Sequence, residues 1–160
     1  IKKLVLAFLT LVFLGGLGVG GWLYLKDKNQ PSPIPAAVRQ QVDFPLYYPA
    51  HLPDGYSVSQ VPTVSESVVV MTVETPSGNN IYISQQAAPT GFDYQKFLSS
   101  ELKRPQEVST SIGVGYIGGP VGRVLGSILT SKTWLLANAN LVGSTESEIK
   151  EVLKSLSLAK

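Results

Sequence analysis

The clearest structural pattern in this 160-residue chain is the stretch SVVVMTVETPSGNNIYISQQA, residues 67 to 87. Residues 67 to 74 are rich in β-branched side chains, which are enriched in strands. Residues 76 to 79, PSGN, supply turn chemistry, and apolar alternation resumes in residues 80 to 87. The stretch therefore predicts an antiparallel hairpin.

Downstream of this hairpin the sequence predicts one helix and three further strands. Residues 93 to 102, DYQKFLSSEL, place apolar side chains at helical spacing, with Asp93 as the N-cap. Short connections favour consecutive antiparallel pairing of the strands. The three runs expected to be strands are EVSTSIGVGYI (107–117), PVGRVLGSILT (120–130) and KTWLLANANLV (132–142).

The C-terminal residues 144 to 160, STESEIKEVLKSLSLAK, predict a second helix. Thr145 and Glu148 match a capping box, and apolar side chains then recur on one helical face. The order of strands, helix, strands and helix predicts an α+β domain over residues 44–160. We expect a mainly antiparallel sheet with two packed helices.

The N-terminal part of the chain predicts a membrane anchor. Residues 4–25, LVLAFLTLVFLGGLGVGGWLYL, carry no charge, and at 1.5 Å per residue they extend roughly 33 Å, enough to cross the hydrocarbon core of a bilayer. Trp22 and Tyr24 lie where aromatic rings favour the headgroup layer. We expect a transmembrane helix with the lipid bilayer as its partner. The alternative is a cleaved signal peptide, whose apolar core is usually shorter.

The segments that flank the anchor predict its orientation. Residues 1–3 carry one more net positive charge than residues 26–28, which favours a cytoplasmic N-terminus and an extracytoplasmic C-terminal domain at the cell membrane. Residues 26–43, KDKNQPSPIPAAVRQQVD, form a Pro-rich linker of the kind that favours polyproline II.

A pair of small residues within the anchor offers a surface for helix-helix contact. Gly16 and Gly20 have the small-xxx-small spacing that lets two membrane helices approach closely, as in a homodimer. The alternative is the ordinary enrichment of glycine in membrane helices.

The composition excludes several kinds of chemistry. The chain has no cysteine and one histidine, so we expect no disulfide framework, no thiolate nucleophile, no metal and no cofactor. It has 13 Lys plus Arg against 11 Asp plus Glu, a net charge of +2. The lysines before the anchor account for that excess. The nearly neutral remainder argues against nucleic acid as a partner.

Two motifs with catalytic or cofactor associations have simpler explanations. Gly113, Gly115 and Gly118 satisfy GxGxxG, but Gly119 and a proline follow where a dinucleotide-binding helix must begin, so we expect a strand end and a turn. His51 has acidic residues nearby in the sequence, but no nucleophile motif accompanies it. We therefore expect no catalytic residues and no enzyme activity.

The segment YYPAHLPDGY, residues 47–56, contains the pattern YPxxLPxGY. In this pattern the chain resembles an uncharacterised bacterial extracytoplasmic domain that follows single membrane helices, as in some anti-sigma factors and sporulation lipoproteins. The similarity continues through residues 81–86, the strand around Trp134 and the final helix. It departs at residues 137–140, ANAN, where the family usually has an Asp-Gly-like turn. The resemblance implies a surface-facing α+β domain concerned with sensing or envelope assembly.

These observations leave three functions open. The first is a single-pass, membrane-anchored binding or regulatory domain whose partner is an envelope protein or peptide and whose ligand-binding residues are unassigned. The second is a membrane-anchored envelope hydrolase that uses His51 or a serine. The third is a structural subunit of a membrane assembly that uses the glycine face of the anchor.

Overall fold

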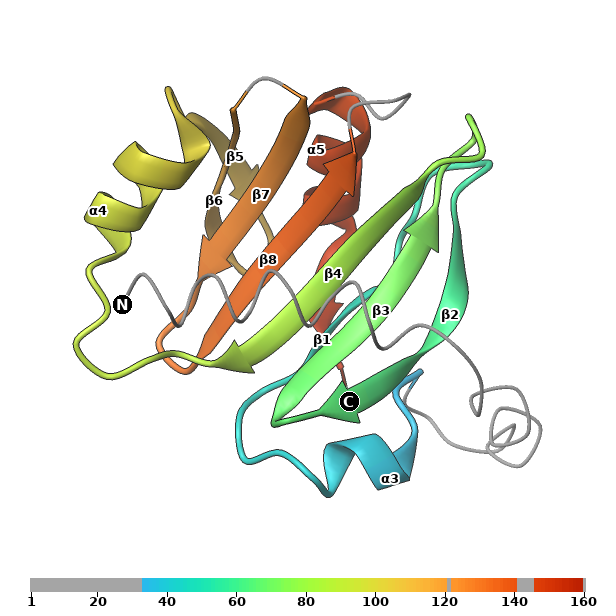
Figure 1. Cartoon of the computed structure of the whole chain (residues 1–160). Coiled ribbons are helices and arrows are strands. Elements are labelled where there is room, and N and C mark those ends of the chain that lie inside the picture. The colour runs from blue at the N-terminus through green and yellow to red at the C-terminus, as the bar shows by residue number, and fades with distance from the viewer. Residues whose placement is uncertain (1–32, 121, 141–145, 160) are drawn as a thin grey trace.

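The structure is a computed structural model that describes residues 33–120, 122–140 and 146–159 (Figure 1). Among these residues, none of the helices combines the length and the apolar character that spanning a bilayer requires. The predicted features that lie outside the described residues are the anchor 4–25, its glycine pair Gly16 and Gly20, and the capping residue Thr145.

One large antiparallel sheet makes up most of the described chain. The hairpin predicted from residues 67–87 is confirmed: its two strands are neighbours in this sheet, with Met71 opposite Ile83. In spatial order the sheet consists of β2 (Ser57–Ser65), β3 (Val68–Glu74), β4 (Asn80–Ala87), β8 (Thr133–Asn140), β7 (Arg123–Leu129), β6 (Gly113–Gly118) and β5 (Gln106–Thr110).

A second, small sheet joins two segments far apart in the sequence. β1 (Tyr47–Pro49) pairs antiparallel with β9 (Leu156–Leu158). On its other side, Tyr47 is held by the fully buried side chain of Gln85 in β4. The Gln85 amide donates to the Tyr47 carbonyl oxygen and accepts from the Tyr47 N–H, both at 2.8 Å. A side-chain amide thus takes the place of a neighbouring strand.

The predicted α+β fold class, a sheet with two packed helices, is wrong, whereas the predicted transmembrane helix 4–25 lies outside the described residues. The described chain is mostly antiparallel sheet, and its helices are few and short. The predicted helix over 93–102 is present as the four-residue α4 (Tyr94–Phe97) followed by the five-residue π-helix η1 (Leu98–Leu102). It ends there because the next residue, Lys103, adopts a left-handed φ of 43°. The final helix, α5 (Glu146–Ser155), has ten residues.

Two strand predictions also need correction. The run 107–117, expected to be one strand, forms the hairpin β5–β6, because the chain turns through Ser111 and Ile112 before Gly113, whose φ is 136°. Residues 57–65 form β2, which the sequence did not predict. Pro62 lies within β2, and proline is tolerated there because β2 is an edge strand.

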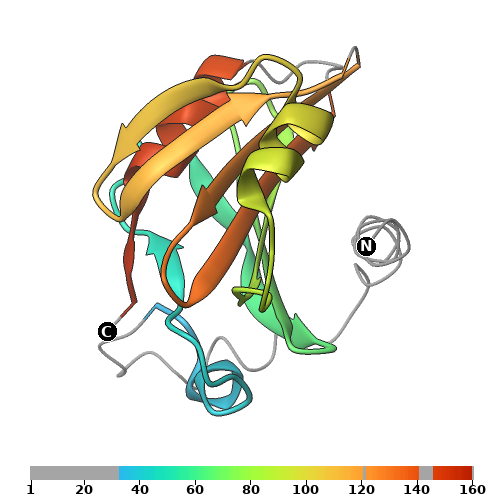
Figure 2. The ribbon, with the colours of Figure 1, turned by 90° about the vertical axis from the view of Figure 1, so that its left-hand side faces the viewer.

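Different helices cover the two faces of the sheet (Figure 2). α5 buries Ile149 and Leu153 completely against one face. Gly126 in β7 makes this close contact feasible, since a Cβ at that position would lie 2.8 Å from Ile149 Cγ2 and 2.9 Å from Leu153 Cδ1. α4 and η1 pack on the opposite face.

A polar group lies inside the aromatic cluster beneath α4, which consists of Phe92, Tyr94, Phe97, Tyr116 and Trp134. The buried Ser127 hydroxyl accepts from the Trp134 indole N–H at 3.0 Å and from the Tyr94 hydroxyl at 3.1 Å. It donates to the Leu135 carbonyl oxygen at 3.3 Å. The ring of Phe97 stacks on Tyr94 and meets Trp134 edge-on. This network fixes the orientation of the aromatic rings that attach α4 to the sheet.

We expect Tyr94 to make the stability of the fold sensitive to alkaline pH. Burial raises the pKa of Tyr94 from 10.0 to about 12, with a smaller raising effect from Tyr116, while the hydrogen bond with Ser127 opposes them. The unfolded chain ionises near 10, so the stability linked to Tyr94 is complete below pH 10 and is lost as the pH rises to 12. Denaturant unfolding at pH 9 and pH 11.5 should show a smaller loss for Tyr94→Phe than for the wild type. Equal losses would contradict this assignment.

The segment before residue 44, predicted to be a linker, contributes to the core. α3 (Ala36–Arg39) follows Ile34, which is fully buried, and carries Val38, which is 7% exposed. Both pack in a cluster with Val69 of β3. This cluster closes the end of the fold next to the pocket described below.

Candidate functional site

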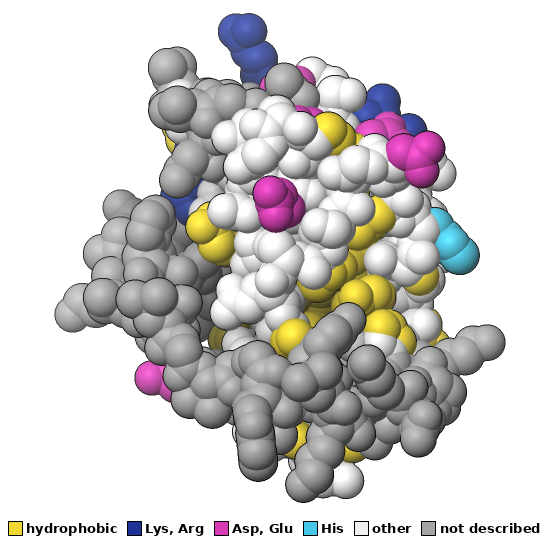
Figure 3. Space-filling view, turned by 90° about the vertical axis from the view of Figure 1, so that its right-hand side faces the viewer, with side chains coloured by type: hydrophobic (Ala, Val, Ile, Leu, Met, Phe, Trp, Pro, Cys, Tyr) yellow, Lys and Arg dark blue, Asp and Glu magenta, His cyan; other side chains and the backbone are white. Residues whose placement is uncertain are grey.

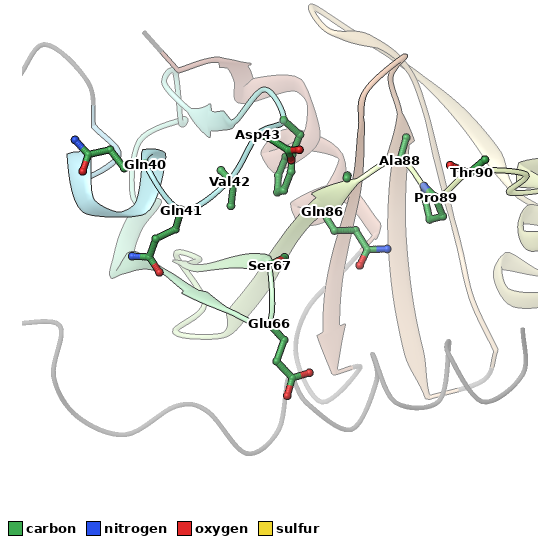
Figure 4. Close-up of a pocket in the computed structure, with 12 residues that line it drawn as sticks. Gln40, Gln41, Val42, Asp43, Glu66, Ser67, Gln86, Ala88, Pro89 and Thr90 are labelled. Atoms are coloured by element: carbon green, nitrogen blue, oxygen red, sulfur yellow. The ribbon is translucent and has the colours of Figure 1, made fainter.

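A pocket of about 720 Å³ opens beside the end of β4 (Figure 4). Three segments far apart in the sequence form its walls. These segments are residues 40–44 after α3, the turn between β2 and β3 at Glu66 and Ser67, and residues 86–90 at the end of β4.

The turn at Glu66 and Ser67 holds its backbone in an unusual conformation. The φ angles are 49° and 63°, so both residues occupy the left-handed region. A two-residue hairpin turn of this kind normally carries Asn or Gly, because a side chain is strained there. The close pairing of Ser65 with Val68 imposes this geometry. The turn therefore presents a carboxylate and a hydroxyl at the rim of the pocket from a constrained backbone.

The polar lining of the pocket has a distinct chemical character. It contains carboxylates, amides and hydroxyls, and none of the described lining residues is Lys, Arg or His. Such a lining repels anions and favours neutral polar or cationic groups. The carboxylates are Asp43 and Glu66, the amides Gln40, Gln41 and Gln86, and the hydroxyls Ser67 and Thr90.

The labelled side chains lie on separate walls of the pocket. Asp43 and Gln86 approach it from different segments, whereas Glu66 extends from the turn away from both of them and Gln40 points away from the other side chains (Figure 4). Asp43 and Glu66 are both exposed to solvent. The carboxylates can therefore contact a ligand without first breaking up a buried ion pair.

The structure does not assemble a catalytic group around His51. His51 lies in the exposed loop after β1 and does not line the pocket, whereas Asp43 does. No salt bridge between described residues involves His51. No group of three His, Asp or Glu side chains within the described ranges is arranged to hold a metal ion.

The glycines of the GxGxxG motif belong to a strand, as expected. Gly113, Gly115 and Gly118 all lie in β6. At Gly118 a Cβ would collide with the backbone carbonyl of Leu102 in η1. Gly118 thus allows the π-helix to approach the sheet, and the motif has a packing role.

The YPxxLPxGY segment lies along α5. The Ala50 N–H donates to the carbonyl oxygen of Ser155 at 3.0 Å, and Leu52 packs against the core that α5 covers. The pKa of the Tyr56 hydroxyl is raised by burial and then by the carboxylates of Glu148 and Glu151 on α5. Leu52 and Tyr56 of the motif therefore have structural contacts that account for them.

Hydrophobic side chains gather in a strip on the face where β2 lies (Figure 3).

The sequence patterns did not identify the residues of the pocket. The strand predicted over residues 67–74 includes Ser67, although the polar triplet at 65–67 between two β-branched runs is a turn signal. Residues 40–43 belong to the predicted linker and Phe44 begins the predicted domain, while residues 86–90 span the end of the predicted strand 80–87 and the residues after it, which carry no motif. Only the tertiary structure places these segments together.

Comparison of the chain with models of protein families, with curated proteins and with solved structures finds no match. The candidate site is therefore defined by the geometry and chemistry of the pocket.

Proposed function

We propose that this chain is a binding domain held at the outer side of a cell membrane through residues 4–25, and that the pocket is its ligand site. The observation that carries this proposal is the pocket itself. Carboxylates and amides line it, and none of its described lining residues is Lys, Arg or His. The apolar segment 4–25 and the resemblance to extracytoplasmic domains support the location and a role in envelope sensing or assembly.

The ligand that suits this pocket is a peptide segment with a basic side chain. Asp43 and Glu66 accept hydrogen bonds from a Lys ammonium or an Arg guanidinium, and such bonds are stronger than those between neutral groups. Amides such as Gln86 both donate and accept, which matches the alternating C=O and N–H groups of a peptide backbone. A segment of an envelope protein combines both features.

We expect the double variant Asp43→Asn with Glu66→Gln to bind a basic peptide about tenfold more weakly than the wild type, because exposed ion pairs contribute about 0.2 to 1 kcal/mol each. The probes are two fluorescent octapeptides that differ only in a central Lys or Glu. Fluorescence anisotropy with the full chain should show preferential binding of the Lys peptide.

The matched control for this prediction is Glu107→Gln, which removes an exposed carboxylate on β5, outside the pocket. It should bind the Lys peptide as the wild type does. Equal affinity for the Lys and Glu peptides would contradict the proposal, as would unchanged binding in the double variant.

A further inference from the structure

The two edges of the large sheet are protected to different degrees. At one edge, β2 contains Pro62, and its pairing with β3 shifts register between Val58 and Gln60 and again between Gln60 and Thr63. Proline and bulges are devices by which natural sheets prevent their edges from pairing with another strand. The β2 edge therefore disfavours association.

The other edge, β5, lacks these devices. Its five residues pair with β6 without a register shift, from Gln106↔Ile117 to Thr110↔Gly113, and none of them is proline. β5 ends the strand order, and no described strand pairs with its outer side, although α5 packs against β5 (Figure 2). An uninterrupted, unpaired edge of this kind is a template for another strand.

The hairpin geometry determines which backbone groups are free to pair. The hairpin closes at Thr110, so alternate residues of β5 direct their N–H and C=O groups toward β6, including Val108. The N–H and C=O groups of Glu107 and Ser109 consequently point away from the sheet. Both side chains are exposed.

We propose that this edge binds a second copy of the chain, with the two β5 strands antiparallel about Val108. In this register Glu107 of one copy lies opposite Ser109 of the other, so the outward-pointing groups form closely spaced hydrogen-bonded pairs. No like charges oppose each other, and all five residues of the strand are used. The two sheets then continue as one sheet across the dimer.

The charges on α5 complement those of a second copy in the same arrangement. α5 runs alongside β5 in the same direction, since the Gln106 side chain donates to the Glu146 carboxylate at 3.4 Å, while the Ser111 hydroxyl donates to the Leu156 carbonyl oxygen at 2.7 Å. A twofold axis at Val108 makes the two α5 helices antiparallel, so that the end of each helix carrying Glu146 faces the end of the other carrying Lys154, which contacts Glu151 of its own helix at 3.2 Å. This charge pattern favours a second copy over an unrelated strand.

The first test is the oligomeric state of the full chain in detergent, measured by sedimentation equilibrium. The wild type should dimerise, and Ser109→Pro should weaken the dimer at least about tenfold, because proline removes the outward N–H and places its ring at the edge. The matched control Ser109→Ala keeps the N–H and should dimerise like the wild type. Circular dichroism checks that each variant is folded.

A second test remains informative if Ser109→Pro fails to fold. Glu146→Lys alone should weaken the dimer, and the double variant Glu146→Lys with Lys154→Glu should restore it. A monomeric wild type would overturn the inference. So would a dimer that is insensitive to these changes but is lost on replacing Gly16 and Gly20 with Leu, because that result would place the contact in the anchor. This inference concerns an edge separate from the pocket and does not depend on the proposed ligand.

Discussion

Replacing Gln85 with Leu is expected to lower the free energy of unfolding by about 3 kcal/mol. Gln85 is fully buried, and its amide satisfies both the N–H and the C=O of Tyr47 at 2.8 Å. Leucine nearly preserves the volume but leaves these two backbone groups without their partner, and each buried, unsatisfied group costs about 1 to 3 kcal/mol. Denaturant unfolding followed by circular dichroism measures the loss.

The matched control for this prediction is the adjacent Gln86→Leu. Gln86 points to the other face of β4, as alternate residues of a strand do, and it is partly exposed. Its replacement should change the free energy of unfolding by less than about 1 kcal/mol. Equal effects at the two positions would show that the bonds to Tyr47 contribute little.

Replacing Gly118 with Ala should cost about 3 kcal/mol, because one methyl group has no space there. A Cβ at Gly118 meets the backbone carbonyl of Leu102, which cannot rotate away as a side chain can. To relieve the collision η1 must move, and this loosens the contact of the neighbouring Phe97 with Trp134. Thermal unfolding measures the stability, and near-ultraviolet circular dichroism reports the order of the aromatic cluster.

Gly115→Ala is the control within the same strand. A Cβ at Gly115 lies 3.1 Å from Ile128 Cγ1, a side-chain atom that can shift by a few tenths of an ångström. We expect a loss of less than about 1 kcal/mol. If both alanine variants were equally stable, the close approach of η1 would not be the reason that position 118 needs a glycine.

The parts of the fold that the sequence predicts are those with local signals. The β3–β4 hairpin combines β-branched strands with a Pro-Ser-Gly-Asn turn. Asp93 predicts the start of α4, and its carboxylate accepts from the Lys96 N–H at 3.0 Å. In each case the residues that determine the structure are neighbours in the sequence.

The parts that the sequence does not predict depend on distant contacts. β1 and β9 have three residues each, too few for a periodic pattern, and they exist because they pair with each other and because Gln85 binds Tyr47. The pocket likewise combines three separate segments, and each alone resembles an ordinary loop. The predicted fold class is wrong for a related reason: the sequence patterns miss β1, β2 and β9 and the division of residues 107–117 into β5 and β6, so they underestimate the amount of sheet.

The pairing of β1 with β9 determines how the fold responds to a pull on its two ends. The strands are antiparallel, and the bond from the Ala159 N–H to the Leu46 carbonyl oxygen, at 2.9 Å, lies where both segments leave the small sheet. Once a pulling force has detached the residues before Leu46 from their cluster with Val69, it loads this bond first and Tyr48↔Ser157 afterwards, so the pairs open one at a time, as in a zipper. Strands pulled in shear would share the load. The small sheet is thus a mechanically soft closure on a stiffer sheet.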